Sequence, residues 1–230
     1  MKIAIMGAMP EEIEPLLAKV ENIKETTYAK NKYYEATYQG KELVIAYSKI
    51  GKVFSTLTAT TLIEKFGCEM LLFSGVAGAI NPSLSIGDLV IANKLCQHDL
   101  DLSPFGHPYG FVPEGAVLIE SDAKLLETAK SVGAKLDIKL HEGTIATGDQ
   151  FVANPERKNW IQETFKADAL EMEGGSVAVV CDALDIPFFI LRAISDSADD
   201  NADMDFDAFL EKSAKISANF ILNMVEELEV

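Results

Sequence analysis

Apolar segments of strand length alternate with amphipathic segments of helix length from one end of the chain to the other. A strand that is buried on both faces is a short continuous apolar run, whereas a helix on a sheet carries apolar residues at steps of three or four. This alternation is typical of a mostly parallel sheet that is covered by helices on both faces. We therefore predict an α/β fold, a three-layer α-β-α sandwich.

The individual segments define the expected elements. Strands are predicted at Lys2–Gly7, Tyr33–Gln39, Leu43–Ser48, Met70–Val76, Asp88–Ala92, Gly143–Thr147, Ala169–Met172 and Phe188–Ser195. Helices are predicted at Pro10–Val20, Val53–Phe66, Asp122–Val132, Pro155–Phe165, Ser176–Leu184 and Phe206–Leu228. The second and third strands are separated only by Gly40 to Glu42, which indicates an antiparallel hairpin. The central sheet is therefore expected to be mixed, although mostly parallel.

The composition is that of one folded domain. A chain of 230 residues with 48% hydrophobic residues can bury a full core, and no Pro-, Ser- or Gly-rich linker divides it. We therefore predict a single domain over residues 1–230. Its 20 basic and 36 acidic residues give a net charge of −16, which opposes contact with phosphate backbones and anionic membranes. Nucleic acids and membranes are not expected as partners.

Two further features bear on the location of the protein. A strand-like segment begins at Lys2, which leaves no room for a secretion signal. The uncharged run Met70–Gly87 contains Gly75, Gly78 and Pro82, and it therefore predicts a buried strand with a loop instead of a membrane span. We expect a cytoplasmic protein.

No metal site is expected from the cysteines and histidines. The cysteines are odd in number, widely spaced and set among apolar residues, at Cys68, Cys96 and Cys181. This pattern favours reduced thiols in the core over disulfides or metal ligands. The histidines lack metal-ligand spacing, at His98, His107 and His141. We interpret them as loop or surface residues.

Carboxylates stand at the ends of two apolar runs that are far apart in the sequence. Glu171 and Glu173 end one run, and Asp196 ends the run that starts at Phe188. Ligands of α/β proteins bind at the carboxyl ends of strands, where desolvating an acid costs free energy unless it has a partner. These acids are therefore the first candidates for an active site. For Asp196, a role as a helix-capping or turn residue is the alternative.

The first strand-to-helix turn, Gly7–Glu12, differs from a phosphate-binding turn. It lacks the spaced glycines and the lysine that such turns use, and Glu11, Glu12 and Glu14 load the helix start with negative charge. These acids suit the helix dipole, which is one explanation for them. The other explanation gives Glu12 a site role, as a base that activates water.

The number and the positions of the arginines bear on whether water or phosphate is the nucleophile. Arg157 and Arg192 are the only arginines, and only Arg192 lies near the candidate acids in the sequence. Enzymes that bind free phosphate usually use bidentate guanidinium groups, so water is favoured over phosphate. For Arg192 itself, a structural ion pair with a strand-end acid is the alternative to a catalytic role.

The segment His98–Glu114 fits neither a helix nor a strand, because it carries three prolines and three aromatic residues. A loop of this length inside a folded domain is usually functional or covers a partner. The alternative interpretation is an ordered surface loop without a functional role.

Six blocks of the sequence resemble the bacterial methylthioadenosine/S-adenosylhomocysteine nucleosidases, in the order and spacing of that family. The blocks are Gly7–Glu12, Ser48–Val53, Ser74–Gly78, Thr147–Phe151, Leu170–Glu173 and Ala193–Asp196. The resemblance runs from Met1 to the final helix. It implies the nucleoside phosphorylase/nucleosidase fold, usually as a homodimer, and hydrolysis of the adenine N-glycosidic bond of small adenine nucleosides without a cofactor.

The resemblance also implies roles for individual residues. Glu12 matches the general base for water, Asp196 the acid that protonates adenine, and Glu173 the carboxylate that holds the ribose hydroxyls. From its position near these acids, and not from the resemblance, we also place Arg192 in the predicted catalytic set. The matching substrate-binding positions are Met172 at the sugar, Gly78 and Ala77 in a glycine turn, Val152 at the adenine edge, Phe151 stacked on the base, Ser195 beside Asp196, and Met9, Ile50 and Phe206 in the apolar lining. Phe105, His107 and Pro113 lie in the loop that relatives lend across the dimer interface.

Three departures from the commoner family pattern leave the substrate preference open. Val76 replaces a hydroxyl residue, Gly174–Gly175 replaces bulkier small residues, and His107–Pro108 replaces an aromatic segment. The loop Asp99–Pro108 resembles the branch that also cleaves 6-amino-6-deoxyfutalosine in menaquinone synthesis. Expected substrates are therefore methylthioadenosine, S-adenosylhomocysteine, aminodeoxyfutalosine and 5'-deoxyadenosine.

The chemistry of the reaction supports these roles independently. Breaking a ribosyl C–N bond builds positive charge on the sugar and negative charge on the purine, so catalysis needs a proton donor and nearby anions. Burial after the apolar run from Phe188 is expected to raise the pKa of Asp196, while Glu12 must stay ionised. A bell-shaped pH dependence follows. A phosphorylase on the same fold and a non-catalytic nucleoside-binding module are the alternatives.

Overall fold

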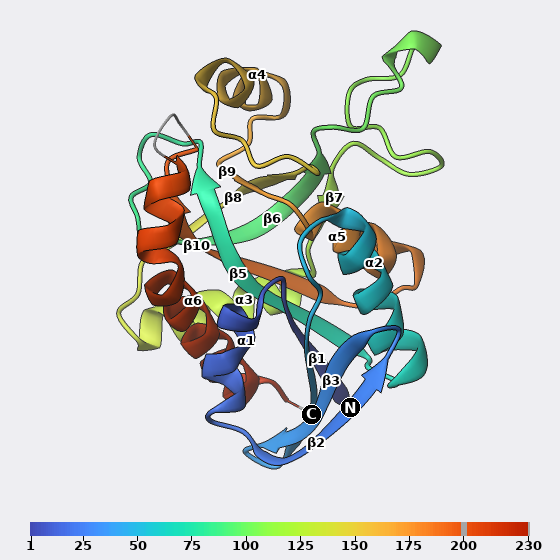
Figure 1. Ribbon diagram of the computed structural model, residues 1–230, viewed down its shortest axis with the longest axis vertical. Helices are drawn as coiled ribbons and strands as arrows, with labels where there is room; N and C mark the ends of the chain where they lie inside the picture. Colours follow the sequence, from blue (N-terminus) through green and yellow to red (C-terminus); the bar gives the residue numbers. More distant parts are fainter. Residues whose placement is uncertain (199–201, 230) are drawn as a thin grey trace.

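The structure, a computed structural model of the chain, describes residues 1–198 and 202–229 (Figure 1). Its strands are β1 (Lys2–Gly7), β2 (Glu21–Tyr28), β3 (Asn31–Tyr38), β4 (Lys41–Tyr47), β5 (Met70–Ala79), β6 (Leu89–Gln97), β7 (Ile119–Glu120), β8 (Leu140–Thr147), β9 (Ala169–Glu171) and β10 (Phe188–Asp196). Its helices are α1 (Pro10–Leu17), α2 (Lys52–Thr60), α3 (Ala123–Lys135), α4 (Pro155–Phe165), α5 (Gly174–Ala183) and α6 (Ala202–Glu227). The predicted alternation of strands and helices is confirmed.

The strands of the described part form one ten-stranded sheet in the order β10-β6-β8-β9-β5-β1-β4-β3-β2, with β7 beside β6. Five pairings are parallel and five are antiparallel, and the parallel ones include the longest. β3 and β4 form the predicted antiparallel hairpin. β5 also pairs with β10, which closes a ring through β6, β8 and β9. The prediction of a mixed sheet is thus confirmed. Within it, the strands β10, β6, β8, β9 and β5 form a closed ring.

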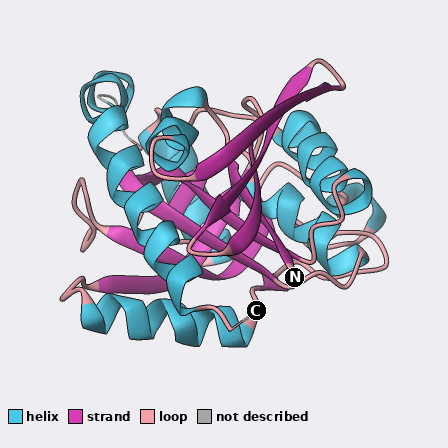
Figure 2. Cartoon of the chain, turned by 90° about the horizontal axis from the view of Figure 1, so that it is seen from below, coloured by secondary structure: helices cyan, strands magenta, loops and turns pink. Residues whose placement is uncertain are grey.

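Helices cover both faces of the sheet, as the three-layer prediction requires. Leu16 of α1 and Ile221 of α6 belong to one core cluster, to which α3 also contributes. Leu62, which follows α2, packs with Val177 of α5 and Phe73 of β5 in the opposite cluster. Figure 2 shows helices on either side of the strands. Because apolar side chains from both layers meet the sheet, its central strands are buried on both faces.

Helix α4 and the loop before β7 lie at one end of the molecule (Figure 1). The helix begins where Asn154 accepts a hydrogen bond from Arg157 N at 3.0 Å, and Pro155 occupies its first turn. Ile161 and Phe165 bury its inner side against a third apolar cluster that includes Val152. The predicted long loop over residues 98–114 holds only a short 3-10 turn at Ser103–Phe105.

Two strands and one break in a helix were not predicted from the sequence. β2 is exposed along nearly its whole length, so it shows no apolar alternation, and β7 has only two residues. The helix predicted at Val53–Phe66 is α2 followed by a π-helical turn at Thr61–Lys65. There the hydroxyl of Thr61 donates to the carbonyl of Leu57 at 2.7 Å, a bond that competes with regular helix geometry.

The cysteines lie in the core, as predicted. Cys68, Cys96 and Cys181 are free and buried, and burial raises the pKa of each thiol to about 12. They are therefore unreactive apolar side chains at neutral pH. Over residues 1–198 and 202–229, no helix combines the length and the apolar character that crossing a membrane requires.

Candidate active site

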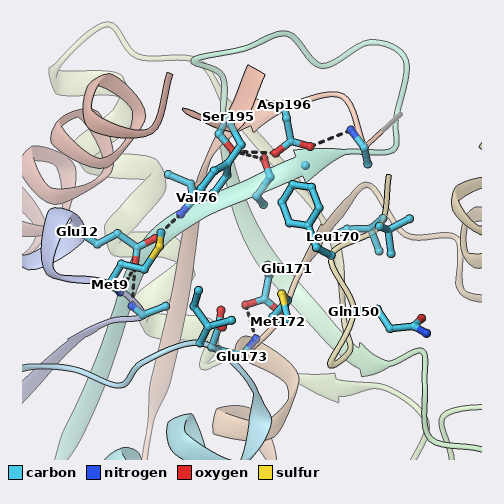
Figure 3. A pocket seen from close by; sticks show the side chains of 18 residues that line it. Met9, Glu12, Val76, Gln150, Leu170, Glu171, Met172, Glu173, Ser195 and Asp196 are labelled. Atoms are coloured by element: carbon cyan, nitrogen blue, oxygen red, sulfur yellow. Dashed lines mark hydrogen bonds between the residues drawn. The ribbon is translucent and has the colours of Figure 1, made fainter. Parts of the chain in front are cut away.

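A pocket opens where the chain leaves β1, β4, β5, β8, β9 and β10 (Figure 3). Its lining comprises Ala8, Met9, Glu12, Ile50, Val76, Ala77, Gly78, Gln150, Phe151, Val152, Leu170, Glu171, Met172, Glu173, Ser195, Asp196, Ala198 and Phe206. Ligands of α/β sheets bind at such strand ends, because loops from several strands converge there. Segments that are up to two hundred residues apart thus form one site.

The structure brings most of the predicted site residues together in this pocket. They are Met9, Glu12, Ile50, Ala77, Gly78, Phe151, Val152, Met172, Glu173, Ser195, Asp196 and Phe206. In particular, Glu12, Glu173 and Asp196 line the same cavity from three different strand ends. The expected convergence of three acids is therefore present.

The carboxylate of Glu12 is held by backbone N–H groups of the turn after β1 and of strand β5. Oε2 accepts hydrogen bonds from Ala8 at 2.5 Å and from Met9 at 3.1 Å, and Oε1 accepts one from Val76 at 3.0 Å. Burial raises the pKa of Glu12, whereas Arg192 and these donors act to lower it. The donors favour the ionised form, since a carboxylate accepts all three bonds. The carboxylate of Glu12 is thus held in a fixed orientation, and burial raises its pKa.

Glu173 is tied to the loop that begins helix α2. Its Oε1 accepts a hydrogen bond from the N–H of Gly51 at 2.8 Å. Gly51 has φ of 100°, a conformation that side chains disfavour, and an added Cβ would lie 2.9 Å from Asp149 Oδ1. Burial first, and then the charge of Glu171, raises the pKa of Glu173 to about 8, although Arg192 opposes this.

Glu171 and Arg192 form a buried ion pair next to the pocket. Arg192 Nη2 lies 2.6 Å from Glu171 Oε2, and the guanidinium carbon is 4.1 Å from the ring centroid of Phe73. The same carboxylate accepts hydrogen bonds from Gly174 N at 2.6 Å and from the hydroxyl of Thr147. Arg192 itself does not line the pocket. Its contacts match the structural ion pair that the sequence left open as an alternative.

Asp196 is oriented by its own neighbours in the chain. Oδ2 accepts a hydrogen bond from Ser195 Oγ and Oδ1 accepts one from Ala198 N, both at 2.9 Å. On the other side lies Gly78, where an added Cβ would approach Asp196 Oδ1 to 2.5 Å. Only glycine fits there, because a larger side chain would displace the carboxylate. Asp196 is 4% exposed, so its carboxyl group is almost fully desolvated.

An apolar wall faces the acids. The rings of Phe151 and Phe206 meet edge to face with centroids 5.7 Å apart. Met9, Ile50 and Met172 add apolar surface to the lining. Aromatic and apolar side chains of this kind accept flat ligand rings, while the acids supply polar contacts.

Besides Arg192, three predicted site residues lie outside the pocket. Phe105, His107 and Pro113 are exposed in the long loop, and His107 stacks on Phe111 with centroids 4.5 Å apart. They do not line the pocket.

Several lining residues were given no role from the sequence. They are Ala8, Val76, Gln150, Leu170 and Ala198. Glu171 was named as a candidate strand-end acid, but it was not given a specific role. The spacing of Glu171 and Glu173 was a usable signal, because two acids separated by one residue at a strand end can both meet a site. Ala8 and Val76 act through backbone N–H groups, which no side-chain pattern reveals.

The electrostatics of the pocket restrict its ligands. Four carboxyl groups line it, whereas no lysine or arginine is among its described lining residues. Within residues 1–198 and 202–229, no group of three or more His, Cys, Asp or Glu side chains is arranged to hold a metal ion. The site therefore suits a neutral ligand on which positive charge develops, and it disfavours anions.

The mixed sheet, the two helical layers and an acid-lined pocket at the strand ends define an enzyme of the nucleoside phosphorylase and nucleosidase class. Comparison with known proteins agrees, since the model of the Phosphorylase superfamily matches residues 2–226. The chain belongs to this family.

Individual relatives show which members of this family the chain resembles. The chain is 58% identical to the aminodeoxyfutalosine nucleosidase of Campylobacter jejuni, over 99% of this chain and 100% of that protein. It is 38% identical to the 5'-methylthioadenosine/S-adenosylhomocysteine nucleosidase of Anoxybacillus flavithermus, over 99% of each. The solved structure of Helicobacter pylori futalosine hydrolase superposes with a TM-score of 0.97 at 52% identity, covering 99% of this chain and 98% of that one. These relatives confirm the resemblance to bacterial nucleosidases and that the chain is an enzyme.

Proposed function

We propose that this protein hydrolyses the N-glycosidic bond of adenine nucleosides and releases adenine, with Glu12 activating water, Asp196 protonating the purine and Glu173 holding the ribose hydroxyls. The observation that carries the proposal is the presence of these three acids in one pocket. Burial strengthens the interaction of each acid with charge that develops on a ligand.

In the proposed reaction, Asp196 acts on the purine and Glu12 acts on the attacking water. Asp196 lines the same pocket as the rings of Phe151 and Phe206, so in this proposal the purine stacks on the rings and receives its proton from Asp196. Glu12 is held by backbone donors in the turn after β1, and it takes the proton of the attacking water. Glu173, whose pKa burial raises to about 8, contacts the ribose hydroxyls through hydrogen bonds and stabilises the oxocarbenium-like sugar when it is ionised.

Methylthioadenosine, S-adenosylhomocysteine, 6-amino-6-deoxyfutalosine and 5'-deoxyadenosine are the proposed substrates, and no cofactor takes part. The names of the relatives support the first three of them. An apolar lining that includes Met9, Ile50 and Phe206 supports a thioether or methyl group at the 5' position. If the protein turns over methylthioadenosine rapidly but aminodeoxyfutalosine only negligibly, aminodeoxyfutalosine is excluded as a substrate.

We also propose a homodimer, acting in the cytoplasm as a single-domain subunit. Helix α2 turns an apolar side outward, with Val53 76% exposed and both Phe54 and Leu57 more than two-fifths exposed. Phe105 is 80% exposed in the long loop. Apolar surface of this kind is typical of protein interfaces. Sedimentation of wild type and of Val53→Asp tests the proposal, which fails if wild type sediments as a monomer.

Chromatography of the reaction products tests the enzymatic proposal. The protein is incubated with methylthioadenosine in buffers with and without inorganic phosphate. Free adenine and free methylthioribose, formed at equal rates in both buffers, are expected. A 5-methylthioribose 1-phosphate product that requires phosphate would identify a phosphorylase, and an intact nucleoside would identify a binding module.

A further inference from the structure

Lys158 connects helix α4 to the loop that carries Asp196. Its Nζ donates a hydrogen bond to the carbonyl oxygen of Ser197 at 2.6 Å, across thirty-nine positions of sequence. We propose that Lys158 is a positioning residue for Asp196 and acts on it through the peptide group between Ser197 and Ala198. This inference rests on the proposed function.

One peptide group connects the ammonium to the acid. Its carbonyl, that of Ser197, accepts from Lys158, and its N–H, that of Ala198, donates to Asp196 Oδ1 at 2.9 Å. Hydrogen bonds at the two ends of an amide polarise it in the same sense, so each strengthens the other. The positive charge of Lys158 therefore makes Ala198 N–H a better donor to Asp196.

The backbone at this position has to be held in place. Ala198 is 1% exposed and has φ of 49°, in the left-handed region that residues other than glycine disfavour. Such a conformation persists only when surrounding contacts compensate for it. The bonds from Lys158 and to Asp196 are two such contacts, and they anchor the same peptide from opposite sides.

The effect of Lys158 grows as the reaction proceeds. Asp196 begins the proposed reaction protonated and becomes an anion when it gives its proton to the purine. A polarised N–H at Oδ1 binds the anion more tightly than the neutral acid. Lys158 therefore stabilises the transition state more than the bound substrate, which predicts an effect on kcat and little effect on KM.

The experiment compares three variants of the full-length protein with wild type, by steady-state release of adenine from methylthioadenosine. Lys158→Met removes the donor and Lys158→Arg restores one. Lys166→Met is the matched control, because the Nζ of Lys166 donates to a backbone carbonyl at the exposed end of the same helix, Glu163 O at 2.9 Å. Thermal unfolding followed by circular dichroism checks that each variant is folded. If Lys158→Met does not fold, Lys158→Leu, which also lacks a donor, takes its place.

For Lys158→Met we expect kcat to fall about tenfold while KM changes less than about twofold. Lys158→Arg should recover kcat to within about threefold of wild type, and Lys166→Met should equal wild type. The inference is overturned if Lys158→Met leaves kcat unchanged or changes KM alone. It is also overturned if Lys158→Arg does not restore kcat, or if the control Lys166→Met loses as much kcat as Lys158→Met. A wild type that releases no adenine would instead contradict the proposed function.

Discussion

Arg192 Nη2 lies 2.6 Å from Glu171 Oε2, and both side chains are almost completely buried beside the pocket. The positive charge of Arg192 also acts to lower the pKa values of Glu12 and Glu173, whereas Glu171 acts to raise that of Glu173. One ion pair thus influences two of the acids to which we assign roles. The predictions below test this pair and the groups around it.

Replacing Glu171 by Gln should destabilise the fold strongly. The substitution leaves Arg192 buried without its counter-charge, and breaking a buried pair in this way costs roughly 3–5 kcal/mol. Urea unfolding of wild type and variant measures the difference. Glu127→Gln is the control, because it breaks an exposed pair with Lys130 and should change nothing measurable. Equal stability of Glu171→Gln and wild type would contradict the prediction.

The stability of wild type should fall as the pH rises from about 5 to about 8. Glu173 has a pKa of about 8 in the folded protein against an ordinary value of 4.5. Between these values the folded state binds more protons than the unfolded state, so the free energy of unfolding decreases with rising pH. Glu173→Gln should flatten this slope by up to about 1.4 kcal/mol per pH unit. Unfolding curves at several pH values measure it.

The raised pKa of Glu12 contributes in the same direction, so some slope should remain in the Glu173→Gln variant. Glu163→Gln, an exposed substitution on α4, serves as the control and should keep the full slope of wild type. An identical slope in wild type and Glu173→Gln would show that Glu173 is already ionised at low pH.

Replacing Asp196 by Asn should remove the proton donor while keeping the shape of the side chain. An amide oxygen can still accept from Ala198 N, so substrate binding should change little. Loss of general acid catalysis typically costs a factor of about 10²–10⁴ in rate. The wild-type pH profile of kcat/KM should be bell-shaped. Asp182→Asn, on an exposed part of α5, should behave as wild type. Full activity of Asp196→Asn would exclude its role as the acid.

Replacing Gly78 by Ala should displace Asp196 without changing any charge. The new Cβ would lie 2.5 Å from Asp196 Oδ1 and 3.1 Å from the Cβ of Ala198. We expect kcat to fall at least about tenfold, with a loss of roughly 1–3 kcal/mol in stability from overpacking. Gly115→Ala is the matched control, since its Cβ would make only ordinary contacts with Val112. Adenine release and urea unfolding distinguish the two variants.

The sequence predicted the site well where chemistry belongs to single side chains. Glu12, Glu173 and Asp196 were recognised because acids at strand ends are costly to desolvate, and because the surrounding blocks resemble a family. The apolar lining, including Met9 and Phe206, was placed by resemblance. The exposed β2 strand was missed, because it is held to β3 by backbone bonds and surface polar contacts and no apolar pattern marks it.

The sequence by itself determined the alternation of strands and helices, the acids that follow the strands, and hence the family. Only the tertiary structure decided that Arg192 pairs with Glu171, that Gly51 donates to Glu173, and that Lys158 reaches Ser197. These contacts join residues that are far apart in the chain. Periodicity records which face of an element is apolar, but burial and pairing depend on the packing of distant elements, which sets the desolvation and the charge around each acid.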